Sequence, residues 1–138
     1  MLKNTGKLYK FTILILCISF ISSCTTKNRQ RVLVYQINDN YFPLEKNCVE
    51  RVYLREDKPM FYLNDNIIIE LDNKKGCVQK FSKFINANIG KQMHISFNGN
   101  DIIPATKIVS EMNFDRGIFS QAVSKKEVAL EIVKAYAN

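Results

Sequence analysis

Four cysteines and one histidine are the side chains of this sequence best suited to chemistry. Cys17 lies inside an apolar run, Cys24 follows "ISS", and Cys48 and Cys77 stand far apart, without any C-x-x-C pair that would indicate thiol redox catalysis. A zinc site needs three or four protein ligands. His94 alternates with apolar neighbours, which predicts a solvent-facing strand residue. The composition therefore predicts no metal site.

Pairs of acidic residues are the remaining candidates for catalysis. Glu56 with Asp57, and Glu70 with Asp72, each have a lysine close by in turn-like sequence. This favours solvated side chains or a helix cap, for Asp72 especially. The sequence has no G-x-S-x-G, phosphate loop or H-E-x-x-H motif. We therefore expect no enzyme and no cofactor.

The first 23 residues have the order of an export signal. Residues 1–10 contain three lysines and no acid, residues 11–21 read "FTILILCISFI", and two serines follow. A membrane-spanning helix needs roughly 20 apolar residues, and this run is about half as long. A signal peptide over residues 1–23 is therefore predicted.

Ile21-Ser22-Ser23-Cys24 resembles a bacterial lipobox. The resemblance implies that the chain is cut before Cys24 and that this residue carries several acyl chains, which is enough for stable membrane anchoring. The alternatives are a simple secretory signal cleaved nearby or an uncleaved anchor. Thr25, in place of aspartate, favours the outer over the inner membrane by the sorting pattern of enterobacterial lipoproteins.

A short polar tether is predicted between the anchor and the domain. The formal net charge of +7 would fall on cleavage by the three signal lysines, 7 − 3 = +4, and the remaining positive charges alternate with acids, so nucleic acid is not an expected partner. Residues 25–31, "TTKNRQR", contain no apolar side chain and span at most about 25 Å. Residues 24–31 thus form a lipidated cysteine and tether that hold the domain near the membrane.

Cys48 and Cys77 are the two cysteines left after processing. An oxidising envelope would allow a disulfide between them. Closing a loop of about 30 residues would contribute on the order of 3 kcal/mol to stability. Two unpaired thiols remain the alternative, because sequence alone does not give their separation.

Short β-like runs and two helical windows make up one α+β domain over residues 32–138. Strands are expected at 31–37, 48–56, 60–72 (two short strands), 93–97, 102–109 and 118–123. Helices are expected at 73–91, ending at Gly90, and at 124–136, starting with a capping box from Ser124 to Glu127. This order predicts a mainly antiparallel sheet with two helices packed on one face.

The clearest local signal is a hairpin around "NGN". Asn98, Gly99 and Asn100 follow an alternating strand, and Asn-Gly tolerates the positive φ angles of a tight turn. Pro104 has no N–H to donate, so the following strand should lie at an edge or be bulged there.

Residues 60–136 resemble the head part of the first periplasmic domain of the SecD protein-export subunit. The matching turn and cap positions are Asn88, Ile89, Gly90, Lys91, Gly99, Pro104, Gly117 and Glu127. The usual Leu-Asp-Gly turn of that family is Phe97-Asn98-Gly99 here. The resemblance implies the head fold and contact with extended polypeptide, but no export motor activity.

Two functions follow as hypotheses. One is a non-enzymatic, membrane-anchored periplasmic module that binds an exported chain or an envelope protein, for example by adding a strand at the Pro104 edge, with Asn98–Asn100 and Pro104 as binding residues. The other is an inhibitor or immunity lipoprotein against a periplasmic toxin or hydrolase, acting through "NGN" or through "NFDRG" at Asn113–Gly117. A hydrolase would need an acid pair in a cleft. The partner and the oligomeric state are left open.

Overall fold

The computed structural model describes residues 31–56, 65–114 and 116–137. Cys24, the signal peptide and most of the tether lie outside these residues. The elements run in the order β1 (Leu33–Ile37), β2 (Asn40–Leu44), η2 (Lys46–Cys48), β3 (Val49–Leu54), β4 (Asp65–Leu71), α2 (Cys77–Asn86), β5 (Gln92–Phe97), β6 (Asn100–Asp101), β7 (Thr106–Lys107), β8 (Ile118–Val123) and α3 (Lys126–Tyr136).

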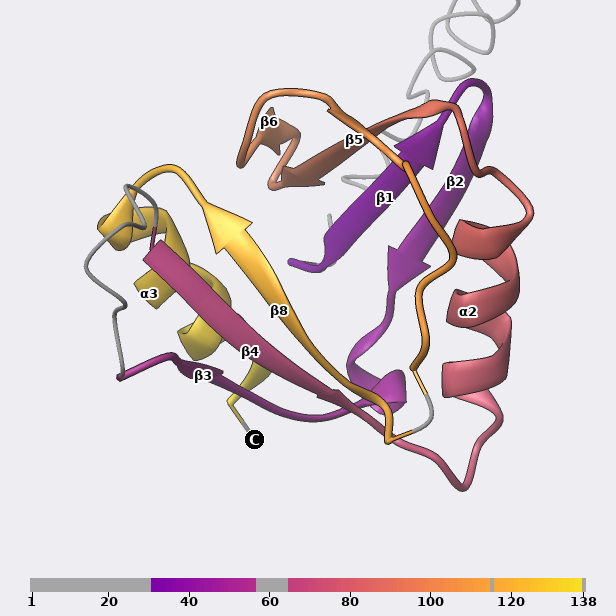
Figure 1. Ribbon diagram of the computed structural model, residues 1–138. Coiled ribbons are helices and arrows are strands. Elements are labelled where there is room, and N and C mark those ends of the chain that lie inside the picture. The colour runs from indigo at the N-terminus through magenta and orange to yellow at the C-terminus, as the bar shows by residue number, and fades with distance from the viewer. Residues whose placement is uncertain (1–30, 57–64, 115, 138) are drawn as a thin grey trace, which may run out of the picture.

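The strands form two antiparallel sheets rather than the single sheet that the sequence predicted (Figure 1). The first sheet has the order β2-β1-β5-β6, with β7 also paired to β5, and the second has the order β3-β4-β8. The α+β class with antiparallel strands and two helices is confirmed. The division follows the chain, because η2 turns it after β2 and β3 then pairs with β4 instead of returning to the first sheet.

Strand β2 was not predicted from the sequence. It returns from β1 through a two-residue turn in which Asn38 has a φ of 52°, and Val34 pairs with Pro43. Proline within a run argues against a strand, which is why "NYFPL" was missed, but β2 lies at a sheet edge where a missing N–H is tolerated. Of the two strands expected at 60–72, the second is β4, and residues 60–64 lie outside the described part.

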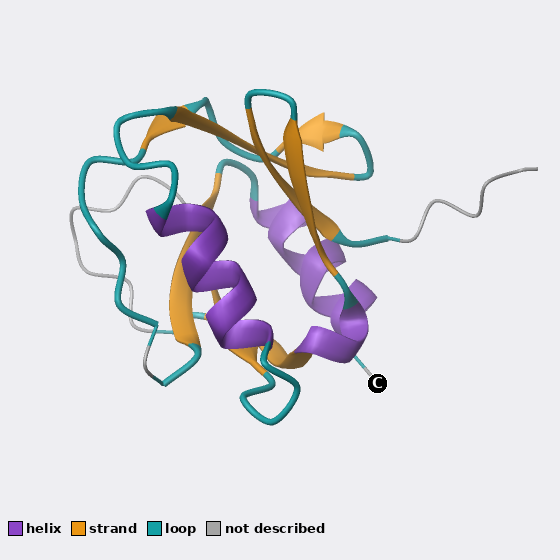
Figure 2. Ribbon diagram, turned by 90° about the vertical axis from the view of Figure 1, so that its right-hand side faces the viewer, coloured by secondary structure: helices purple, strands orange, loops and turns teal. Residues whose placement is uncertain are grey.

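The two helices keep their expected apolar faces. Helix α2 buries Cys77, Val78, Phe81 and Ile85. Helix α3 packs closest to β3 and β4 of the second sheet. Helix α2 lies on the opposite side of the molecule from α3 in Figure 1, and both helices are seen below the first sheet in Figure 2. The predicted capping box is wrong: Lys125 is the N-cap and makes no side-chain bond. The Ser124 N–H donates to the Ile102 oxygen at 2.8 Å, so the helix begins one residue later.

One aromatic cluster joins the two sheets. The Phe81 ring of α2 lies 4.9 Å from Tyr35 of β1 and 5.1 Å from Phe119 of β8, measured between centroids. The rings of Phe42 and Phe114 complete the cluster, with centroids 5.3 and 5.1 Å from that of Phe81. The sheets therefore share a single hydrophobic core.

Candidate functional site

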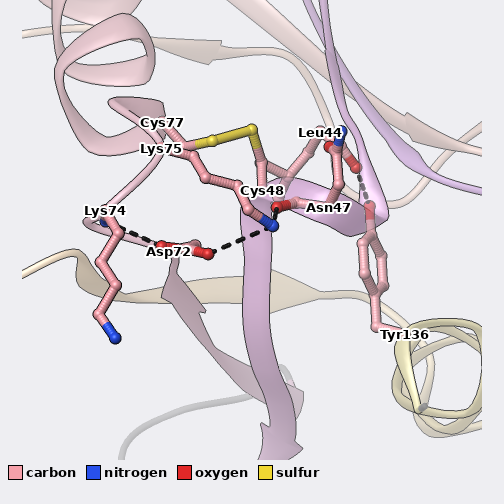
Figure 3. Close-up of a disulfide and its surroundings, with 8 residues drawn as sticks. All are labelled: Leu44, Asn47, Cys48, Asp72, Lys74, Lys75, Cys77 and Tyr136. Atoms are coloured by element: carbon pink, nitrogen blue, oxygen red, sulfur yellow. Dashed lines mark hydrogen bonds and ion pairs between the residues drawn. A yellow bond between two sulfur atoms is a disulfide. The ribbon is translucent and has the colours of Figure 1, made fainter.

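The predicted disulfide between Cys48 and Cys77 is present (Figure 3). The sulfurs are 2.06 Å apart, and the bridge ties the start of β3 to the first residue of α2. Asp72 lies beside it: its carboxylate accepts the Lys74 N–H at 2.8 Å and pairs with Lys75 at 3.4 Å. The Lys74 hydrogen bond is the main cause of a lowered pKa of Asp72. These contacts order the segment that leads into α2.

The hairpin turn at Asn98–Asn100 has the expected conformation. Asn98 and Gly99 have φ angles of 53° and 81°, which are the two positive values of a type I′ turn. His94 lies across the hairpin from Asp101, 3.6 Å from its carboxylate, and both side chains are exposed. The predicted solvent-facing position of His94 is confirmed.

Pro104 lies in a bulge rather than in a continuous strand 102–109. The Ile102 N–H donates to the Ile95 oxygen, and the next pair joins Thr106 to Met93. On β5 one residue, His94, lies between Met93 and Ile95. On the facing segment three residues lie between their partners, Ile102 and Thr106. The predicted edge or bulge at Pro104 is thus confirmed, and the strand is split into β6 and β7.

In the second candidate loop, Asn113–Gly117, the residues on either side of position 115 are held against the core. Phe114 is buried, and its oxygen accepts the Gly117 N–H at 2.6 Å. The Asn86 side chain of α2 binds both the N–H and the oxygen of Met112, at 2.9 and 3.0 Å. In Figure 1 the β5–β6 turn lies at the top and the chain entering β8 lies at the bottom, so the two candidate loops do not form one site.

The open edge of β8 is a feature that sequence reasoning missed. The Leu71 N–H donates to the Gly117 oxygen at 2.8 Å, which fixes the alternation of the β4–β8 ladder. Ile118, Ser120 and Ala122 consequently direct their N–H and C=O groups away from β4. Within the described residues, Ile118 and Ser120 donate no hydrogen bond to another backbone, and the Ala122 oxygen accepts only the Gln121 side chain.

The other strand edges are each interrupted or covered. Edge strand β2 contains Pro43, β6 and β7 are separated by the Pro104 bulge, and the register of β3 is interrupted between Val49 and Arg51. Prolines, bulges and covering helices are the devices by which proteins keep edges from pairing with other chains. β8 has none of these in the part of the chain that the structure describes.

A small apolar cavity of about 40 Å³ lies beside the β8 edge. Its lining comes from both sheets, α2 and the loop before β8: Tyr35, Phe81, Ile85, Met93, Met112, Phe114, Phe119, Ser120 and Gln121. The Tyr35 hydroxyl donates to the Gln121 side chain at 3.3 Å, and burial raises the pKa of Tyr35 well above its ordinary value. Two flexible methionines therefore flank a strand with free backbone groups.

The opposite face of the second sheet carries an ionic cluster. Arg51 donates to both oxygens of Glu70 at 3.1 and 2.8 Å, and Tyr53 donates to the same carboxylate at 3.0 Å. The Arg51 bond is the main cause of a lowered pKa of Glu70. Among the described residues no three His, Cys, Asp or Glu side chains come together as a metal site, and no helix is long and apolar enough to cross a membrane.

Comparisons with known proteins identify the fold. No family model and no curated protein matches this chain. A solved structure of "a membrane component SecDF that enhances protein export" is similar with a TM-score of 0.56 and 15% identity over 99% of this chain and 70% of that chain. A crystal structure of SecDF in its super-membrane-facing form is similar with a TM-score of 0.52 and 15% identity, over 91% of this chain and 16% of that chain. These similarities confirm the predicted SecD-like fold.

Proposed function

We propose that this protein is a non-enzymatic, lipid-anchored envelope module that binds an extended polypeptide along the edge of β8. The observation that carries the proposal is the free backbone edge at Ile118 and Ser120, beside an apolar cavity and on a domain whose other edges are interrupted or covered. Strand addition at an open edge is a recurring way to bind extended peptides.

The chemistry of the edge suits an unfolded chain. Main-chain hydrogen bonds supply affinity without reading sequence, and alternate side chains of the added strand reach the cavity lined by Met93 and Met112. Methionine side chains adapt to different apolar groups. A cavity of about 40 Å³ accepts a small apolar side chain, or a larger one if the methionines move. These features favour β8 over the Pro104 bulge as the proposed binding site.

Lipid attachment at Cys24 supports a position at the periplasmic face of a membrane, with the outer membrane favoured. The arguments are the lipobox-like "ISSC", the short apolar run before it and the Cys48–Cys77 disulfide, which suits an oxidising compartment. Lipid labelling of the protein in its own host tests the anchor: we expect label on the wild type and a full-length, unlabelled precursor for Cys24→Ser. Label on Cys24→Ser would contradict the assignment.

The edge is tested with a permanently unfolded probe, a reduced and carboxymethylated polypeptide, and with its folded, disulfide-intact form. We expect the full-length protein to bind the unfolded form only, with slowed amide exchange at Ser120. Ser120→Pro removes an outward donor without breaking the β4 ladder and should weaken binding about tenfold or more. The matched control is Tyr41→Pro, at an outward position of edge strand β2. Equal effects of both prolines, with thermal midpoints unchanged, would contradict the proposal.

The inhibitor hypothesis is favoured by one observation, the preformed and exposed β5–β6 turn. It predicts a single folded partner, bound at one-to-one stoichiometry. Asn98→Ala with Asn100→Ala would then abolish binding, while Ser120→Pro would leave it intact.

A further inference from the structure

A second surface, at the C-terminal end of α2, combines exposed apolar side chains with lysines. Ile89 is 47% exposed and Val109 is 80% exposed. The Gly90 N–H donates to the Ile108 oxygen at 2.7 Å, and the Ile108 N–H donates to the Lys91 oxygen at 3.0 Å, so the two segments lie side by side. We call Ile89, Lys91, Lys107 and Val109 the basic tip.

Positive charge continues from this tip along α2. Lys80 and Lys83 are exposed residues of this helix. Helix α2 lies on the side of the molecule that faces the viewer in Figure 2. Residues 73–100 contain five lysines and no acidic residue. Glu111 is the acidic residue closest along the chain to Val109, and Asp101 lies beside His94 at 3.6 Å. The tip therefore has two lysines beside two exposed apolar side chains, and α2 adds two further exposed lysines along the chain before it.

We propose that the basic tip docks on an anionic phospholipid bilayer, with Ile89 and Val109 at the level of the head groups. Clusters of four or more basic residues bind anionic lipids, and apolar side chains beside them add burial at the interface. A protein partner fits less well, because lysine is depleted at the cores of protein interfaces and the tip has no aromatic or arginine anchor. A lipid surface needs no matching shape.

This docking rests on the proposed membrane attachment and orients the proposed binding edge. Helix α3 lies on the other side of the molecule from α2 in Figure 1. A domain lying on its tip therefore directs α3 away from the bilayer and leaves β8 open to the side.

Tryptophan fluorescence tests the docking, since the chain has no tryptophan of its own. The full-length protein carrying Val109→Trp is reconstituted into vesicles of 30% phosphatidylglycerol and 70% phosphatidylcholine, or of phosphatidylcholine alone, each with brominated acyl chains. Leu130→Trp on α3, at a residue 47% exposed, is the matched control. We expect strong quenching at position 109 in anionic vesicles only, and little quenching at position 130 in either.

Charge reversal supplies the second readout. Lys91→Glu with Lys107→Glu should reduce the quenching at position 109 by half or more, as should 0.5 M salt, because exposed charges are screened. Lys125→Glu with Lys126→Glu, at the start of α3, should leave the quenching unchanged. Equal quenching at both positions, quenching at 109 in neutral vesicles, or no effect of the Lys91 and Lys107 reversals would overturn the docking. Protein that attaches to neither vesicle would contradict the anchor instead.

Discussion

At the scale of single residues, the Tyr136 hydroxyl joins α3 to the first hairpin. It accepts the Leu33 N–H at 2.9 Å and donates to the Leu44 oxygen at 2.5 Å, the second of these bonds being drawn in Figure 3. The hydroxyl thus bridges the Leu33–Leu44 pair at the open end of the β1–β2 ladder. Burial raises the pKa of Tyr136 above its ordinary value, so the hydroxyl stays protonated and able to donate.

Tyr136→Phe should therefore destabilise the protein by about 1–3 kcal/mol, because two buried backbone groups lose their partner. Urea unfolding gives the change in the free energy of unfolding. Tyr41→Phe is the control: this residue is 61% exposed and its hydroxyl only accepts a bond from Gln36, so a change within about 0.5 kcal/mol is expected. A loss as large for Tyr41→Phe would show that the bridge is not the cause.

Glu70 makes part of the stability dependent on pH. Its pKa is lowered mainly by the Arg51 hydrogen bond, so the folded state binds a proton less readily than the unfolded chain. The contribution is present above the unfolded-state pKa of about 4.3 and is lost as the pH falls through the lower folded-state value.

Glu70→Gln should accordingly flatten the fall in thermal midpoint between about pH 5 and pH 2–3, while lowering the midpoint at pH 7. Glu50→Gln, at an exposed position of the same strand pair, should keep the wild-type slope. An unchanged slope in Glu70→Gln would exclude the Arg51–Glu70 pair as a source of acid sensitivity.

At the scale of the elements, the disulfide fixes where α2 begins. It closes a loop with a sequence separation of 29 residues. The chain-entropy model gives about 3–4 kcal/mol for such a loop. The double change Cys48→Ser with Cys77→Ser should lower the free energy of unfolding by about that amount, and dithiothreitol should destabilise the wild type without affecting the variant. Equal sensitivity of both proteins to the reductant would show that the disulfide is not the source of this stability.

Gly117 allows β8 to start against β4. Its φ is 66°, and an added Cβ would lie 3.0 Å from a Val78 methyl and 3.1 Å from the Leu71 oxygen. Gly90 has a φ of 88° but no atom within 4 Å of the same position. Both alanine variants pay about 1–2 kcal/mol for the left-handed backbone, and Gly117→Ala should lose roughly 1–3 kcal/mol more by overpacking. Urea unfolding of the pair measures this difference, and equal losses would contradict it.

Local sequence patterns predicted most of the helices and strands, but they did not predict which strands pair with one another. The apolar spacing of α2, the alternation of β5 and the Asn98-Gly99 turn each depend on neighbouring residues, and all three are present. Strand β2 was missed because Pro43 argues against a strand, and only its place at an edge makes that proline acceptable.

The candidate site was harder to predict for the same reason. Whether β8 has a free edge depends on which strands of the whole chain pair with it. The residues of "IFSQAV" predict a strand but do not indicate its partners. The cavity beside it draws on residues from Tyr35 to Gln121. The only local signals were Met93 and Met112, which are close to the edge but were not interpreted as part of a site.

At the scale of the whole molecule, Phe81 makes two sheets into one folding unit. Its side chain is 1% exposed and its ring contacts aromatic residues of both sheets and of the loop before β8. A core shared in this way should give one cooperative transition, as most domains of this size do.

Phe81→Ala should consequently cost about 3–5 kcal/mol and weaken both sheets together. Native-state hydrogen exchange provides the measurement: amide protection in β1 and in β4 should fall by the same factor, because both open through the same global unfolding. Phe84→Ala, at a half-buried position on α2, is the control and should cost less. A loss of protection confined to one sheet would mean that the sheets unfold separately, and that the β8 edge could open to a bound chain without disturbing β1.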